Sequence, residues 1–299
     1  MQKITPFLWF DKNCEEAINF YTTLFPNSEV TSINRYPEGP LEPPMAGMEG
    51  KVLTAVFQLA GQKFMALDGG PHLKFNPSVS FFVTLPTEQE VDDLYNKLND
   101  GATILMPLQK YEFAEKYVWL QDKYGLPWQI MLGQSDQTII PSYMLVGENF
   151  GKAEEALNFY TGIFKNSKID VISHYDAGTP DEGKINYALF TLEGQKFTLM
   201  ESGMDHKFET TAAISEYIEC ETQQEVDYYW DKLSEGADPS HQQCGWVQDK
   251  YGFSWQVIPT ALPRLLSNPD KAKSGRAMQA MLQMKKIIIA DLEAASDAE

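Results

Sequence analysis

The sequence predicts an α+β protein in which a pair of βαβββ modules occurs twice in tandem and is followed by a C-terminal helix. Two observations lead to this prediction. The stretch Trp119–Gln129 returns as Trp246–Gln256, with eight of eleven positions identical. Each copy is apolar, then turn-forming, then apolar again, which is typical of a β-hairpin. Around these hairpins, β-rich runs alternate with amphipathic helical segments.

Shorter repeats show that the duplication covers most of the chain. Glu15–Thr22 returns as Glu154–Thr161, and Gly61–Phe64 returns as Gly194–Phe197. The distance between matching residues shrinks along the chain, which indicates loops of different length on a shared scaffold. We therefore predict three parts: a first domain over residues 1–134, a second domain over residues 138–260 and a helical tail over residues 261–299.

In the first copy, helix signals mark the two helical segments. Asn13 is the expected cap of a helix that ends at Pro26, and Thr87 with Glu90 forms the pattern of a capping box. The expected elements are strand Ile4–Phe10, helix Asn13–Phe25, strands Glu29–Tyr36, Val52–Leu59, Lys63–Leu67 and Val79–Leu85, helix Glu88–Leu98, and strands Ala102–Met106, Tyr117–Gln121 and Pro127–Leu132.

The second copy follows the same order. Its expected elements are strand Ile139–Val146, helix Lys152–Phe164, strands Ile169–Tyr175, Ile185–Leu192, Lys196–Met200 and Ile214–Glu219, helix Gln223–Leu233 and hairpin Gly245–Ile258. In the tail, apolar residues at helical spacing predict one helix from about Lys271 to Leu292. Such a helix would close the core or a subunit interface, or offer a methionine-rich binding surface.

Composition excludes several classes of partner. The net charge of −18 disfavours nucleic acid and anionic membranes, which would be repelled. No apolar run is long enough to span a bilayer, and the N-terminus lacks the pattern of a signal peptide. Cys14, Cys220 and Cys244 are few and scattered, as expected of reduced thiols. We therefore expect a cytoplasmic protein.

Several motifs together resemble the vicinal oxygen chelate superfamily, which includes glyoxalase I, bleomycin and fosfomycin resistance proteins and extradiol dioxygenases. Within it, the sequence is most similar to the PhnB-like branch, whose domain is labelled 3-demethylubiquinone-9 3-methyltransferase. The motifs are the opening Ile4–Phe10, the Glu-Glu-Ala-x-Asn-Phe-Tyr helix, Gly69–Asn76, Glu225–Leu233 and both Gln-Asp-Lys-Tyr-Gly hairpins. The resemblance implies tandem glyoxalase-like domains, in each of which two βαβββ modules form a curved mixed sheet around a pocket.

The resemblance also implies where a metal would bind. Metal-dependent members place His or Glu ligands on the first and last strand of each module, pointing into the cup. Their last-strand glutamate falls on Gln129 and Gln256, and a neutral amide is a poor substitute for a carboxylate. The first strands offer Thr5, Phe7 and Trp9 in one copy and Pro141, Tyr143 and Leu145 in the other. We therefore expect no metal at the usual site and no cofactor.

Five residues are the candidates for ligand binding. By the superfamily geometry, Gln129 and Gln256 look into the cup, where an amide can orient a small polar ligand or simply satisfy its neighbours. His72 and His206 recur in loops beside Lys and Phe, and they either contact an anion or brace their loops. Glu216 lies in a predicted strand without a matching histidine.

Three functions remain open from the sequence. The first is a metal-free protein that binds a small organic molecule in an apolar cup. The second is a metal-assisted lyase, dioxygenase or group-transfer enzyme with atypical ligands such as His72, His206 or Glu216. The third is the methyltransferase of the domain label, although no Gly-x-Gly loop of a doubly wound methyltransferase occurs. A homodimer or a pseudo-dimeric monomer fits all three.

Overall fold

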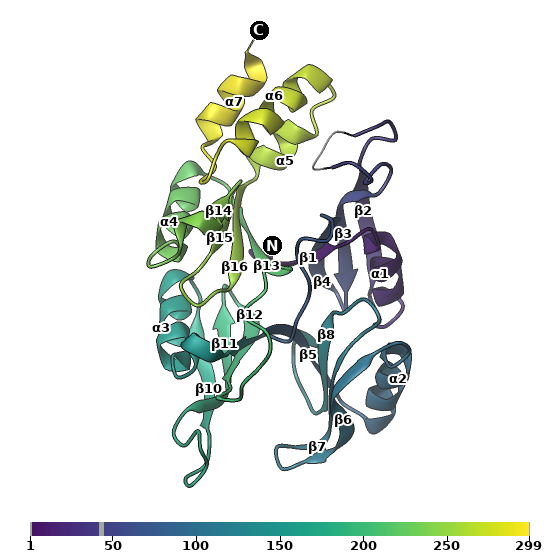
Figure 1. Cartoon of the computed structure of the whole chain (residues 1–299), viewed down its shortest axis with the longest axis vertical. Helices are drawn as coiled ribbons and strands as arrows, with labels where there is room; N and C mark the ends of the chain where they lie inside the picture. Colours follow the sequence, from purple (N-terminus) through teal and green to yellow (C-terminus); the bar gives the residue numbers. More distant parts are fainter. Residues whose placement is uncertain (1, 42–44, 299) are drawn as a thin grey trace. The chain divides into compact units, whose positions relative to one another are not determined.

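The computed structural model describes residues 2–41 and 45–298 (Figure 1). By its internal contacts the chain divides into two compact units. The central unit comprises Pro6–Ile214, and the terminal unit combines Met1–Thr5 with Ser215–Glu299. The predicted domain boundaries describe the repeat in the sequence, whereas these units have different bounds. The junction of the two sequence copies lies inside the central unit.

The central unit contains two helical modules of the first copy and the first module of the second copy. The first module consists of β1 (Ile4–Phe10), which begins in the terminal unit, α1 (Cys14–Tyr21), β2 (Glu29–Arg35), β3 (Val52–Leu59) and β4 (Gln62–Asp68). The second consists of β5 (Val79–Leu85), α2 (Glu88–Leu98), β6 (Thr103–Tyr111), β7 (Ala114–Gln121) and β8 (Pro127–Leu132). The third consists of β9 (Ile139–Leu145), the 3-10 turn η1 (Gly147–Asn149), α3 (Ala153–Ile163), β10 (Lys168–His174), β11 (Ile185–Leu192) and β12 (Gln195–Glu201).

One eight-stranded mixed sheet lies wholly in the central unit, with strand order β10-β11-β12-β9-β5-β8-β7-β6. At its middle β5 pairs antiparallel with β9, so that Phe82 lies opposite Ile140. β5 also pairs in parallel with β8, and β9 with β12. The sheet is therefore assembled from the second module of the first copy and the first module of the second copy. The remaining strands of the unit run in the order β1-β4-β3-β2.

The two faces of this sheet differ in what covers them. Helices α2 and α3 pack on one face, where Trp128 and Phe81 are fully buried. Trp128 also packs against Tyr21 of α1, with ring centroids 5.6 Å apart. The opposite face, which we call the cup face, carries Phe82 and Gln129, which lie opposite each other in the register. Alternation along each strand assigns the other side chains to one face or the other.

The first residues of α1 and α2 test the two predicted helix caps. Glu90 N donates to Thr87 Oγ1 at 3.2 Å, so the predicted N-cap at Thr87 is confirmed. Glu90 Oε2 accepts from the Thr87 hydroxyl at 2.6 Å, whereas the glutamate of a capping box accepts from the backbone N–H of the cap residue. The predicted cap at Asn13 is wrong, because its side chain makes no capping hydrogen bond. Cys14 N instead donates to Oδ1 of the buried Asp68 at 2.9 Å. A carboxylate from the end of β4 thus replaces the local cap, which sequence spacing could not reveal.

The terminal unit holds the fourth module and the tail. Its elements are β13 (Ile214–Cys220), α4 (Gln223–Leu233), the 3-10 turn η2 (Pro239–His241), β14 (Gln242–Gln243), β15 (Trp246–Gln248), β16 (Ser254–Pro259), α5 (Ala261–Leu266), α6 (Lys271–Leu282) and α7 (Ile289–Asp297). Its strands run β14-β15-β16-β13, and Glu219 N donates to Lys3 O beside β13. In the described part of the chain, no helix has the length and apolar character needed to span a membrane.

The predicted continuous helix from Lys271 to Leu292 is wrong, because the segment between α6 and α7 is bonded to the β14–β15 turn. Cys244 N donates to Met284 O at 2.8 Å, and Gly245 N donates to Lys285 O at 2.7 Å. These two bonds tie the segment to the turn, and α6 ends at Leu282 while α7 begins at Ile289. The apolar residues at helical spacing therefore belong to two shorter helices.

We expect Ile287→Ala to lower the free energy of unfolding by about 3 kcal/mol, since it leaves a cavity at a fully buried site between α6 and α7. The measurement is urea unfolding of the full chain. Leu282→Ala is the matched control, because Leu282 is 42% exposed and its truncation should cost less than about 1 kcal/mol. Equal losses in the two variants would contradict the assignment of Ile287 to the core.

Candidate functional site

The candidate site lies on the cup face of the central unit, where the first and last strands of two modules meet. β5 and β9 are first strands and β8 and β12 are last strands. Gln129 of β8 is 1% exposed, so its amide needs partners inside the protein. The sheet order brings all four strands together and places their cup-face side chains around Gln129.

Three side chains satisfy the Gln129 amide. Its Nε2 donates to Ser80 Oγ at 2.8 Å and to Ser142 Oγ at 3.2 Å. Its Oε1 accepts from Tyr117 Oη at 2.6 Å. Burial raises the pKa of Tyr117 well above its ordinary value, so this hydroxyl stays protonated and remains a donor. The network fixes the orientation of the amide and uses no charged group.

Thr198 completes the set of polar side chains around Gln129. It lies opposite Ser142 in the parallel register of β9 and β12, and its side chain is fully buried. Its Oγ1 has no hydrogen-bond partner in the described part of the protein. We call Ser80, Gln129, Ser142 and Thr198 the polar quartet. Each member comes from a different strand, and each is neutral.

The polar quartet does not fit a metal ion of the usual kind. Hydroxyl and amide oxygens are weak ligands for Zn²⁺, Fe²⁺ or Ni²⁺, which prefer imidazole, thiolate or carboxylate. Over residues 2–41 and 45–298, no three His, Cys, Asp or Glu side chains gather in a way that could hold a metal. The donor set of this site is instead suited to hydrogen bonding with a small molecule.

Aromatic rings form a continuous wall beside the polar quartet. Phe82 lies 6.3 Å from both Tyr117 and Tyr187, measured between ring centroids. Tyr111 lies 5.7 Å from Tyr117 and 5.4 Å from Phe113, on which it stacks. We call these five rings the aromatic ladder. It runs from the centre of the cup face to the β6–β7 turn, where Phe113 is 62% exposed.

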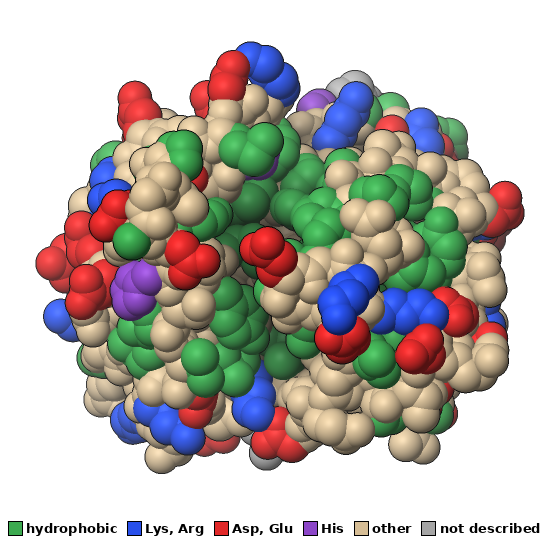
Figure 2. Space-filling view, turned by 90° about the horizontal axis from the view of Figure 1, so that it is seen from below, with side chains coloured by type: hydrophobic (Ala, Val, Ile, Leu, Met, Phe, Trp, Pro, Cys, Tyr) green, Lys and Arg blue, Asp and Glu red, His purple; other side chains and the backbone are tan. Residues whose placement is uncertain are grey.

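Figure 2 looks onto the end of the central unit that carries β6, β7, β10 and β11, and shows it hollowed in the middle with hydrophobic side chains on the walls. Ile140, Leu189 and Met131 pack with Phe82 and Tyr117 in one apolar cluster. An apolar hollow with a few convergent polar groups is the usual form of a small-molecule site.

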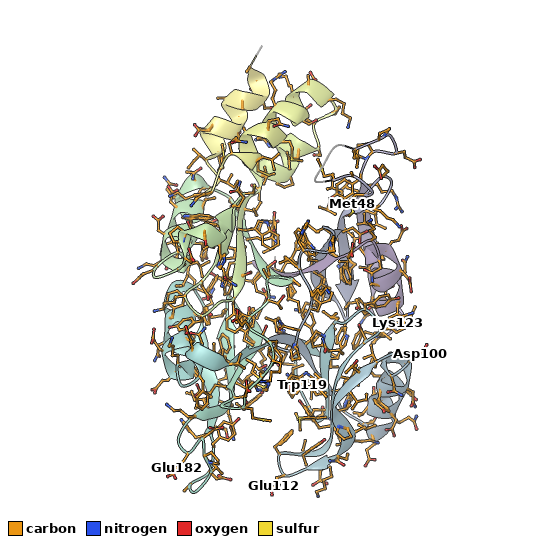
Figure 3. All side chains as sticks on the ribbon, viewed as in Figure 1. Met48, Asp100, Glu112, Trp119, Lys123 and Glu182 are labelled. Carbon is orange, nitrogen blue, oxygen red and sulfur yellow. The ribbon has the colours of Figure 1, made fainter. Side chains whose placement is uncertain are left out.

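Trp119 joins the aromatic ladder to the polar quartet. It lies opposite Gln129 in the register of β7 and β8, and Figure 3 shows it on the inner side of the sheet. Its indole Nε1 is buried and has no hydrogen-bond partner among the described residues. A buried indole N–H normally finds an acceptor. The site therefore contains two buried groups, Thr198 Oγ1 and Trp119 Nε1, whose hydrogen bonding is incomplete.

The expectation that Pro141, Tyr143 and Leu145 face the cup is wrong. Tyr143 packs on the helix side, with its ring 6.3 Å from Tyr160 of α3. Ser142, which accepts from Gln129, faces the cup instead. The signal was present in the sequence, because Pro141 matches Pro6 in the repeat and Ser142 therefore matches Phe7. A shift of one residue in a strand exchanges its two faces.

Gln256 repeats part of this arrangement in the terminal unit. It is 4% exposed, and its Nε2 donates to Ser215 Oγ at 3.0 Å. These two residues match Gln129 and Ser80 in the repeat. Both predicted glutamines are thus buried amides bonded to a serine of the neighbouring strand.

Glu216 does not share a face with Gln256. It lies opposite Trp255 in the register of β13 and β16, and Trp255 is fully buried with its Nε1 bonded to Asp249. Side chains of adjacent residues point to opposite faces of a strand, so Glu216 and Gln256 do not converge. Glu216 matches the buried Phe81 of the central unit rather than a member of the polar quartet.

The two loop histidines lie outside the polar quartet. His72 is exposed in the loop after β4. His206 Nε2 lies 2.9 Å from Ser202 Oγ in the loop after β12, and its ring packs against Phe208 with centroids 5.0 Å apart. Partial burial lowers the pKa of His206 and so favours its neutral form. These contacts match the role of a brace within a loop.

A family model described as 3-demethylubiquinone-9 3-methyltransferase matches residues 2–131 and again residues 137–258. The chain belongs to this family. Both halves of the repeat are therefore copies of the same PhnB-like domain. Sequence reasoning identified this family but missed Ser142 and Thr198, because their roles depend on pairing between modules of different copies. It also missed Tyr117, which bonds to Gln129 within one hairpin.

Solved structures give the wider setting of this PhnB-like family. A PhnB protein from Bacillus cereus, described as a 3-demethylubiquinone-9 3-methyltransferase, is 47% identical over 44% of this chain and 100% of its own, with a TM-score of 0.41. Glyoxalase I from Zea mays is 11% identical over 84% of this chain and 92% of its own, with a TM-score of 0.51. The second likeness shows the shared fold. No curated protein matches the sequence.

Proposed function

We propose that the protein binds a small organic molecule on the cup face of the central unit, without a metal ion at that place. The polar quartet orients the polar atoms of the ligand, and the aromatic ladder holds its apolar body. Supporting this proposal, Thr198 Oγ1 is fully buried beside Ser142 and lacks a partner among the described residues. A ligand atom that bonds to it would remove the cost of a buried, unsatisfied hydroxyl, about 1–3 kcal/mol.

The metal-assisted alternative finds less support in the site. The candidate ligands of that alternative are His72, His206 and Glu216. His72 is exposed, His206 contacts Ser202 within its own loop, and Glu216 lies opposite Trp255 rather than beside Gln256. Metal analysis of the purified protein tests the alternative directly. One tightly bound Zn, Fe, Ni or Mn ion per chain would overturn the metal-free proposal.

The methyltransferase activity in the family description is a separate candidate. A methyl donor such as S-adenosylmethionine carries a sulfonium charge and needs partners for its ribose hydroxyls. The polar quartet offers no carboxylate for either task. Calorimetric titration with S-adenosylmethionine is expected to give no heat of binding, and a stoichiometric titration would support the methyltransferase instead.

The main test replaces two small polar residues of the cup face with the larger residues found at the matching positions of the repeat. Phe7 and Met65 occupy the positions that match Ser142 and Thr198 in the repeat, and they lie opposite each other in the register. We expect the double variant Ser142→Phe/Thr198→Met to fold normally and to lose at least about 100-fold in affinity for cup ligands, because bulk replaces both polar groups.

The measurement is ligand-observed NMR with a library of small aromatic and aliphatic fragments, followed by titration of the hits. Asp100→Asn serves as the control, since Asp100 is an exposed loop residue. Hits that bind the wild type and the control but not the double variant support the proposal. A library without hits, or hits that bind all three proteins equally, would overturn it.

A further inference from the structure

Two groups at the candidate site lack hydrogen-bond partners among the described residues, and they restrict the kind of ligand that the site can bind. Trp119 Nε1 is a donor only, whereas a threonine hydroxyl donates or accepts. Tyr117 Oη and Gln129 Nε2 already donate within the network. Each of the two unsatisfied groups, Trp119 Nε1 on β7 and Thr198 Oγ1 on β12, can thus be satisfied by an acceptor atom on a ligand.

Charge at the site restricts the ligand further. Charged residues at the margins of the cup face are paired with each other rather than with the polar quartet. Lys196 of β12 forms an ion pair with Asp136, and Lys110 pairs with Glu115 at 2.7 Å on the β6–β7 hairpin. Burial raises the pKa of Tyr187, so the hydroxyl of this ring stays protonated and neutral. A charged ligand would lose its hydration here without gaining a counter-ion.

The aromatic ladder restricts the shape of the ligand. Tyr111 and Phe113 stack with an interplanar angle of 16°, and Tyr117 meets Phe113 edge-on at 78°. The hydroxyl of Tyr111 donates to Pro107 O at 2.9 Å, so its ring presents only its faces and edges. Rings fixed in this way give most contact to a flat, conjugated partner.

We infer that the cup face of the central unit takes an uncharged, planar, conjugated molecule that presents a carbonyl-type acceptor to Trp119 or to Thr198. The inference rests on the proposed function and narrows it to a ligand class. Trp119 and Thr198 then act as specificity determinants, because a molecule without the acceptor leaves both groups unsatisfied.

Comparison of the repeated sequences shows that the hydroxyl groups of Ser142, Thr198 and Tyr117 each occur in only one half of the repeat. At the positions matching Ser142, Thr198 and Tyr117, the other modules carry Phe7, Met65 and Cys244. The other half therefore lacks the hydroxyls of the polar quartet on two strands and the ring that bonds Gln129. We expect one molecule of this ligand class per chain, not two.

The test compares four small molecules that vary the acceptor, the charge and the shape of the ligand. 2-Acetylnaphthalene is neutral, planar and carries a carbonyl; 2-ethylnaphthalene lacks the acceptor, 2-naphthoate carries a negative charge, and cyclohexyl methyl ketone is not planar. Titrations followed by ligand-observed NMR give the dissociation constants. We expect 2-acetylnaphthalene to bind at least about 10-fold more tightly than the other three.

Two variants connect this selectivity to named atoms. Thr198→Val removes the hydroxyl and Trp119→Phe removes the indole N–H. At least one of these variants should weaken binding of 2-acetylnaphthalene by about 5–10-fold while leaving 2-ethylnaphthalene unchanged. Unchanged affinity for 2-acetylnaphthalene in both variants would overturn the inference. Trp246→Phe is the control, since Trp246 matches Trp119 in the other copy. It should leave both affinities unchanged.

The outcomes separate the inference from the proposed function. Tightest binding of 2-naphthoate or cyclohexyl methyl ketone, or equal loss of both naphthalenes in Thr198→Val and Trp119→Phe, would overturn the ligand class. If fragments bind the cup face but none of the four molecules does, the ligand class is wrong and the proposed function stands. If nothing binds in either experiment, the proposed function is wrong as well.

Discussion

Replacement of Asp122 by alanine is expected to lower the free energy of unfolding by about 4 kcal/mol. The carboxylate is buried and accepts from the backbone of Tyr124 at 2.8 Å and of Leu126 at 3.0 Å. It also accepts from Tyr21 Oη at 2.8 Å and from Trp128 Nε1 at 2.9 Å. The alanine variant leaves four donors without their acceptor.

The expected loss of unfolding free energy is smaller than the sum for four separate hydrogen bonds, because burial of the Asp122 carboxylate is itself unfavourable. Burial raises the pKa of Asp122, although the bonds from Trp128 and Tyr21 lower it in part. Removing the carboxylate therefore also removes a desolvation cost. Chemical denaturation at pH 7 measures the loss. Asp100→Ala is the control, and a loss at Asp122 no larger than at the exposed Asp100 would show that the carboxylate does not join α1 to the hairpin.

Replacement of Gln129 by leucine is expected to cost about 2–3 kcal/mol of stability and to abolish binding on the cup face. Leucine has a similar size but no polar atoms, so Tyr117 Oη loses its acceptor and the hydroxyls of Ser80 and Ser142 lose their donor. All of these groups are buried, where unmade hydrogen bonds are most costly.

Gln256→Leu is the matched comparison for Gln129→Leu, because Gln256 occupies the same place in the repeat. Its amide donates to the single serine Ser215, and we expect a loss of about 1 kcal/mol without an effect on cup ligands. Unfolding in urea and the NMR titrations described above provide both readouts. Unchanged ligand affinity in Gln129→Leu would contradict the assignment of this residue to the site.

Much of the fold could be predicted from local sequence signals. The repeated hairpin, the Thr87 N-cap and the alternation of strands and helices identify the modules and their order. These signals depend on neighbouring residues in the sequence, so they predict helices and strands whatever the arrangement of the modules. The pairing of β5 with β9 is different, because Phe82 and Ile140 are brought together by the junction between copies and not by a local pattern.

The site could be predicted only in part, for the same physical reason. Gln129 was recognisable, because its hairpin is repeated and its strand face follows from alternation. Ser142 and Thr198 enter the site through strands of another copy, and their side chains matter only once the sheet is assembled. The unsatisfied state of Thr198 Oγ1 is a property of the packed core and leaves no mark in the sequence.

The mixed origin of the eight-stranded sheet has a consequence for how the chain can vary. In an assembly of identical subunits, one gene encodes both sides of every symmetric interface, so each substitution appears in both subunits. Here each module has its own stretch of coding sequence. Ser142 and Thr198 could therefore diverge from Phe7 and Met65 without a compromise between the two halves. Fusion of the copies thus permits the two halves to carry different side chains at matching positions.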